Sequence, residues 1–147
     1  MSAQDVAKLR EETGAGILDC KKALEEAGGD LAKAKELIAV KGLIKAEKKS
    51  DRDTGAGHIE AYVHSGRVGV LVEIHAETDF VTRNESFKEA AKNIAMHIVA
   101  SAPTSVEDLL TQPYLHDPNI NIEAYLKSII AKVGENVKIS RFTRYEL

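Results

Sequence analysis

The sequence has one cysteine, no tryptophan and only 5% aromatic residues, and it lacks long apolar runs. A lone cysteine, Cys20, can form neither an internal disulfide nor a cysteine-built metal site, which points to a reducing compartment. No segment approaches the roughly 20 apolar residues of a membrane-spanning helix, and residues 1–10 lack the apolar core of a signal peptide. From these absences we expect a cytoplasmic protein with an aliphatic core and no contact with a membrane.

A marked excess of charge of one sign is also missing, because 20 Lys and Arg residues stand against 23 Asp and Glu residues, for a net charge of −3. This balance provides no general attraction to nucleic acid. The stretch from Lys41 to Arg52 is more basic, and we interpret it as the solvated face of a connector rather than as a phosphate-binding patch. Nucleic-acid binding, which we do not expect, would depend on scattered basic side chains: Lys45, Lys48, Lys49, Arg141 and Arg144.

Motifs for phosphate binding and catalysis are missing as well. No loop of the G-x-x-x-x-G-K-[ST] type is present, and the Gly-Ala-Gly segments at residues 14–16 and 55–57 are better explained as turns. A metal site could be assembled only from three histidines and two acidic residues on the predicted strands: His58, His64, His75, Glu73 and Glu77. Polar residues on the solvent-facing side of a sheet are the commoner explanation. We therefore expect no cofactor, no metal, no direct nucleotide binding and no bond-making enzyme.

The N-terminal third of the chain is predicted to be a three-helix module. The spacing of Ile17, Cys20 and Leu24 indicates a helix with these residues facing the core. The turn at residues 14–16 separates it from a first helix, and Asp30 is placed to begin a third. Three helices this short bury little apolar surface, so the module is expected to lean on a partner.

Beyond residue 57, strand and helix patterns alternate. They predict three strands and three helices, with a loop at residues 113–118: strands 58–64, 68–76 and 137–145, and helices 87–99, 106–110 and 122–133. The predicted fold class is α+β, a small three-stranded antiparallel sheet packed on helices. The predicted organisation is a ubiquitin-associated-like module at residues 1–42, a basic helical linker at residues 43–56 and this α+β domain at residues 57–147.

One connecting segment carries bulky apolar side chains that the core pattern does not require. Phe80 and Val81 lie between the second strand and the long helix, directly after Asp79. Phe80 could close the end of the core, or it could stand exposed beside a carboxylate as an anchor for another protein.

A second candidate surface lies at the start of the helix that contains Cys20. Ile17 belongs to the core stripe of this helix, whereas Leu18 lies about 100° around it, on the side of Lys21. Arg10 in the first helix could border the same surface. In a module too small to be self-sufficient, these residues suggest a protein-docking face.

The segments just described resemble the elongation factor Ts family of bacteria. Residues 9–24 with Gly29-Asp30 look like its ubiquitin-associated-type module, and residues 68–84 look like its core signature. Residues 112–118 and 134–147 are similar to its C-terminal end. The likeness covers nearly the whole chain in the same order, with three separate motifs.

The resemblance implies guanine-nucleotide exchange on elongation factor Tu. In the family, the Asp and Phe of the T-D-F-V segment enter the GTPase domain of the partner and disturb the helices that position its magnesium and phosphate-binding loop. This implies that Asp79 and Phe80, with Val81 in the same segment, contact the partner. Positions matching Arg10, Ile17, Leu18 and Lys21 dock the N-terminal module in the family, with Met where this chain has Ile17 and Leu18.

The chain also departs from the family pattern. Long members carry two related core subdomains and an inserted helical hairpin, whereas this chain has room for one core and resembles a trimmed short form. Short members act as homodimers, so the resemblance also raises a homodimer here. The rival hypothesis is a non-catalytic adaptor that binds another protein through the ubiquitin-associated-like module.

Overall fold

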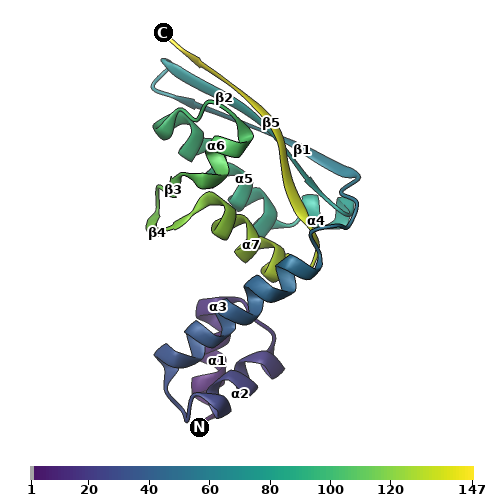
Figure 1. Ribbon diagram of the computed structural model, residues 1–147, viewed down its shortest axis with the longest axis vertical. Coiled ribbons are helices and arrows are strands. Elements are labelled where there is room, and N and C mark those ends of the chain that lie inside the picture. Colours follow the sequence, from purple (N-terminus) through teal and green to yellow (C-terminus); the bar gives the residue numbers. More distant parts are fainter. Residues whose placement is uncertain (1) are drawn as a thin grey trace.

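The computed structural model describes residues 2–147. Three helices, α1 (Ala3–Thr13), α2 (Ile17–Glu26) and α3 (Leu31–Lys48), form one end of the molecule. A three-stranded sheet covered by helices forms the other end, and α3 extends from the first part to the second (Figure 1). Among the described residues, no helix is both long and apolar enough to cross a membrane.

Local signals set the ends of the N-terminal helices. Ser2 and Asp5 form a capping box at the start of α1, and Gly14 ends that helix with a φ of 70°, in the left-handed region that favours glycine. The Asp30 carboxylate accepts hydrogen bonds from the Ala32 and Lys33 N–H groups at the start of α3, as the sequence predicts. The three helices enclose a small core: Leu9, Cys20, Ala23, Leu24 and Ala34.

The predicted inward position of Ile17 is wrong. Ile17 is the first residue of α2 and its side chain is 55% exposed. Helical spacing places Ile17 on the same side as Cys20 and Leu24, but the helix begins at Ile17 and no other element covers this first turn. Periodicity alone therefore overestimates how far the core stripe extends.

Helix α3 belongs to both parts of the molecule. Ala34 lies in the small N-terminal core, whereas Ala46 lies in the main core. Between them, α3 lies against α7 (Ile122–Val133), and Lys127 on α7 donates a 2.8 Å hydrogen bond to Glu47. Helix α3 crosses the predicted boundary between residues 42 and 43. The division of the chain into residues 1–42, 43–56 and 57–147 stays a prediction.

The main sheet has the order β1-β2-β5, and both strand pairs are antiparallel: β1 (Ala56–His64), β2 (Val68–Ala76) and β5 (Val137–Glu146). Its hairpin turn has Ser65 and Gly66 with φ of 52° and 65°, the left-handed pair that suits a two-residue turn between twisted strands. Helices cover one face of the sheet: α4 (Asp79–Thr82), α5 (Glu85–Ser101), α6 (Val106–Thr111) and α7. The predicted α+β fold is confirmed.

Two details of this part differ from expectation. Residues 113–118, predicted as a loop, form most of a small hairpin of β3 (Pro113–Tyr114) and β4 (Asp117–Asn121).

The second difference concerns the faces of β1. Its half-buried residues are His58, Glu60 and Tyr62, and the His58 ring meets Phe87 edge-on at 6.0 Å. The face of β1 that carries His58, Glu60 and Tyr62 therefore turns toward the helices, whereas Ile59 and Val63 face outward with exposures of 62% and 66%.

Candidate partner-binding site

Phe80 is the most exposed aromatic side chain among the described residues, at 84%. It lies on α4, a single helical turn between β2 and α5, where the sequence suggests only a connecting segment. Asp79 precedes it and is also exposed. The interpretation in which Phe80 closes the end of the core is wrong, and the chain instead displays an aromatic ring beside a carboxylate.

The other half of the same turn faces inward. Val81 is 5% exposed and belongs to the main core, and Thr82 is buried with its hydroxyl donating to the Asp79 carbonyl at 3.1 Å. A four-residue helix has too few hydrogen bonds to be stable alone, so burial of Val81 fixes the orientation from which Phe80 projects. Val81 was predicted with Asp79 and Phe80 as a contact residue, but its side chain is directed into this chain.

The second predicted surface lies on the N-terminal helices. Leu18 is 72% exposed, and Ile17, Arg10 and Lys21 are exposed beside it. A groove of about 710 Å³ runs between α1 and α2, with Val6 among the apolar side chains that line it. Arg10, Ile17 and Lys21 line this groove, whereas Leu18 lies outside it. The structure thus brings three of the four predicted docking residues together around an apolar floor, with Glu11 as a third charged side chain beside Arg10 and Lys21.

Comparison with known proteins places this chain in a family. A family model described as Elongation factor TS matches residues 77–147. Elongation factor Ts of Aquifex aeolicus is 48% identical over 99% of this chain and 52% of its own length. The Rippkaea orientalis protein is 40% identical over the whole of this chain and 78% of its own length. The Thermotoga petrophila protein is 42% identical over 97% of this chain and 94% of its own length. The chain belongs to the elongation factor Ts family.

Membership of the elongation factor Ts family assigns the chain to translation elongation and confirms the resemblance seen in its sequence. The chain spans about half the length of the Aquifex protein. Its alignment with the Rippkaea protein extends over 194 positions, against 147 residues in this chain. That relative of the elongation factor Ts family therefore carries residues inside the aligned region that this chain lacks.

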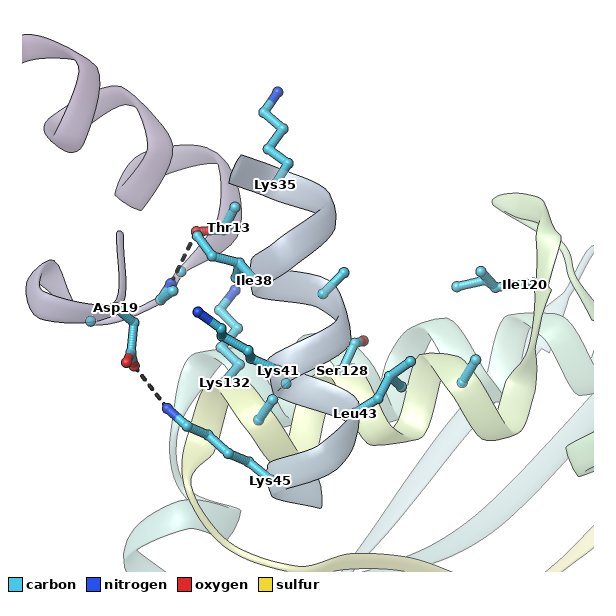
Figure 2. A pocket seen from close by; sticks show the side chains of 17 residues that line it. Thr13, Asp19, Lys35, Ile38, Lys41, Leu43, Lys45, Ile120, Ser128 and Lys132 are labelled. Carbon is cyan, nitrogen blue, oxygen red and sulfur yellow. Dashed lines mark hydrogen bonds and ion pairs between the residues drawn. The ribbon is translucent and has the colours of Figure 1, made fainter. Parts of the chain in front are cut away.

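A second cavity, of about 420 Å³, lies where α3 and the turn at residues 14–16 face α7 (Figure 2). Four lysines line it, and three of them form ion pairs: Lys45 with Asp19 at 2.8 Å, Lys41 with Glu26 at 2.6 Å and Lys35 with Glu12. These pairs lower the pKa of Glu12 and of Asp19, chiefly through hydrogen bonds from the lysines. With most of its positive charge neutralised, the cavity is poorly suited to a phosphate group.

The histidines and acidic residues of the strands lie in pairs. The His58 Nε2 is 2.9 Å from a Glu60 oxygen, and the His75 Nε2 is 3.6 Å from a Glu73 oxygen. Within residues 2–147, no three His, Cys, Asp or Glu side chains are grouped to hold a metal ion. Desolvation raises the pKa of the Glu73 carboxyl, but the charge of Arg141, 3.0 Å away, and hydrogen bonds from Ser140 and Arg141 outweigh it, so this pKa is lowered.

The sequence pattern did not indicate a buried polar cluster between α5 and the β3–β4 hairpin. His97 on α5 is fully buried, and its Nδ1 accepts a 3.2 Å hydrogen bond from the Leu115 N–H. Its Nε2 therefore carries the proton and donates to Gln112 at 2.9 Å. Tyr114 packs on the neighbouring Tyr125 with ring centroids 4.1 Å apart, and burial raises its pKa. Burial lowers the pKa of His97, so the cluster fixes the β3–β4 hairpin with a neutral imidazole.

Proposed function

We propose that this chain is a guanine-nucleotide exchange factor that binds elongation factor Tu and promotes release of its GDP. The observation that carries the proposal is the display of Phe80, 84% exposed beside Asp79, on a turn held by the buried Val81. A rigid exposed aromatic ring is the type of side chain that dominates protein interfaces. The N-terminal docking face and the family membership support the same partner.

Thermodynamics explains why such a protein needs no nucleotide site or bond-making chemistry of its own. Exchange requires that the factor bind its partner more tightly when the nucleotide is absent. The coupling is reciprocal, so the free energy by which the factor weakens GDP binding equals that by which GDP weakens factor binding. Each tenfold change needs about 1.4 kcal/mol, and one buried aromatic anchor contributes roughly 2–4 kcal/mol. The cell's excess of GTP then gives the cytoplasmic reaction its direction.

The residues divide into two groups in this proposal. Asp79 and Phe80 enter the partner near its magnesium and phosphate site, and Val81 positions them from within the core. Ile17, Leu18, Arg10 and Lys21 dock on the nucleotide-binding domain from the N-terminal module. The groove between α1 and α2 supports three members of this second group, because Ile17 contributes to its apolar floor and Arg10 and Lys21 line it, together with Glu11.

The experiment is stopped-flow release of a fluorescent GDP analogue from elongation factor Tu. We expect Phe80→Ala to slow release at least about tenfold, with an unchanged melting temperature because the ring is exposed. Leu115→Ala, also an exposed apolar side chain, is the matched control and should have no effect. Lys48→Ala in the basic linker should cost less than Phe80→Ala. Tight binding of the partner without faster release would instead support the adaptor hypothesis.

The homodimer also has a candidate surface, the uncovered face of the main sheet. Cross-strand neighbours form two rows on this face, Ala61–Leu71–Thr143 and Val63–Gly69–Tyr145. Four large apolar side chains are exposed there: Ile59, Val63, Leu71 and Tyr145. We propose that a second copy of this chain covers this face. The face carries both a carboxylate, Glu73, and a cation, Arg141, so two copies related by a two-fold axis can place opposite charges against each other. Sedimentation equilibrium should show a dimer that Val63→Lys converts to a monomer; a wild-type monomer overturns this.

A further inference from the structure

The start of α4 is held by a residue far away in the sequence. Thr78 precedes Asp79, and it makes no side-chain cap of its own to the helix. Its N–H donates to Glu135 Oε1 at 3.0 Å and its hydroxyl donates to Glu135 Oε2 at 2.8 Å. Both carboxylate oxygens of Glu135 are thus engaged by one residue, and hydrogen bonds to a charged acceptor are the stronger kind.

The segment that carries Glu135 is itself fixed. Asn136 is 2% exposed, and its amide donates to the Ser50 carbonyl at 3.2 Å and the Arg52 carbonyl at 2.8 Å. Its backbone N–H donates to Glu77 at 3.0 Å. The turn between α7 and β5 therefore joins the segment after α3 to the end of β2, and Glu135 extends from an immobilised backbone.

These contacts matter because α4 is too short to define its own direction. Val81 and Thr82 hold the inner side of the turn in the core, but the residue at its start, Thr78, provides no side-chain cap to the helix. The two hydrogen bonds that Thr78 donates to Glu135 hold this end of the turn. A side chain that must enter another protein binds better when its orientation is already set, because binding then incurs less of the entropy cost of ordering it.

We propose that Glu135 is a positioning residue for nucleotide exchange, which acts by fixing through Thr78 the direction in which Asp79 and Phe80 project. This inference rests on the proposed function, since it assigns Glu135 to the same site. Glu135 is not proposed to touch the partner. The sequence alone does not indicate this role of Glu135. It shows only a polar Glu-Asn pair directly after the glycine that ends α7.

The first test measures GDP release with variants at both ends of the contact. Glu135→Ala and Thr78→Val should each slow release about fivefold to tenfold, in the range of one lost charge-assisted hydrogen bond. The double variant should be little slower than Glu135→Ala, because both changes remove one contact. Thr78→Ser keeps the donor groups and should retain the wild-type rate. Glu123→Ala, an exposed carboxylate on α7, is the control and should have no effect.

The second test needs no partner. The chain has three phenylalanines, so incorporation of fluorophenylalanine gives three ¹⁹F signals, and Phe80→Leu identifies the signal of residue 80. In Glu135→Ala the Phe80 signal should change in relaxation, whereas the buried Phe87 signal stays as in wild type. An unchanged Phe80 signal, or a Glu135→Ala rate equal to wild type while Phe80→Ala is slow, overturns the inference. If Phe80→Ala itself releases GDP normally while Glu135→Ala mobilises the ring, the proposed function fails and the positioning contact stands.

Discussion

The two surfaces that we propose for partner binding rest on cores of very different size. Phe80 stands on a turn anchored by Val81 in the main core, which includes residues from three strands and several helices. Ile17 and Leu18 stand on a three-helix module whose buried core consists of Leu9, Cys20, Ala23, Leu24 and Ala34. Phe80 is therefore presented from a large, fixed core, whereas the docking face of Arg10, Ile17, Leu18 and Lys21 depends on a module with little stability of its own.

The largest expected effect is on the small core. Leu9 is fully buried in it, and Leu9→Ala should remove about 2–5 kcal/mol, more than a module of this size can lose. Hydrogen–deuterium exchange should show protection lost across α1 and α2 but retained in the sheet. Ile94→Ala, the same type of truncation in the main core, should instead lower the melting temperature of the sheet and α5. Uniform loss of protection in Leu9→Ala would show that the two cores unfold together.

The junction between the two regions gives the next largest effect. A Cβ on Gly42 would lie 3.2 Å from the Ala131 Cβ, so Gly42→Val forces α3 and α7 apart at a cost of roughly 1–3 kcal/mol. Chemical denaturation should report the loss, and Ala131→Gly in the same chain should restore most of it. The same substitution at the exposed Gly55, where an added Cβ would have no neighbour within 4 Å, is the control. Failure of Ala131→Gly to rescue would mean that the helices are not held apart by this contact.

Substitutions at the docking face should affect a different kinetic quantity from substitutions at Phe80. Ile17→Ala combined with Leu18→Ala should raise the factor concentration that gives half-maximal GDP release by about tenfold, equivalent to roughly 1.4 kcal/mol. The maximal release rate should stay near wild type, because in the proposed function these residues bind the partner without entering its nucleotide site. Titration of the release rate against factor concentration separates the two quantities. A reduced maximal rate would place the docking face in the exchange step.

The smallest expected effect concerns pH and is confined to the larger region. Burial lowers the pKa of His97 below 6.5, so the unfolded chain takes up a proton at a higher pH than the folded chain. The contribution of neutral His97 to the free energy of unfolding is fully present above pH 6.5. It is lost as pH falls toward and through the lowered pKa, by no more than about 1.4 kcal/mol per pH unit.

Thermal melts of wild type and His97→Gln between pH 7.5 and 5.5 test this. Glutamine can keep an acceptor for Leu115 and a donor for Gln112 without titrating, so its melting temperature should fall less. Parallel pH curves for the two proteins would assign the pH dependence to other groups. Protection of the α1 and α2 amides should change less than that of the β3–β4 hairpin.

Much of the fold could be predicted because its signals are local. Asp30, Asn84 and Asn121 cap helices through their own side chains, and the Ser65-Gly66 turn sets the hairpin. The predictions failed where neighbours decide the outcome. Ile17 obeys the core period but lies at an uncovered helix end, and the β3–β4 hairpin depends on a buried histidine from α5.

The candidate site divides in the same way. The sequence pattern singled out Phe80 and Val81 beside Asp79, and the family motif implied contact with a partner, but neither could tell which of these side chains faces the core. Glu135 and Thr78 are 57 residues apart, and no spacing rule connects two such positions.

The amino-acid order by itself therefore determined the α+β class, the helix caps and the family of this protein, since capping, turn conformation and apolar period involve residues only a few positions apart. Tertiary packing alone decided that Val81 turns inward and Phe80 outward, and that α3 joins two cores. Those outcomes depend on which surfaces meet in space, because a side chain is buried by its neighbours and not by its own place in the chain.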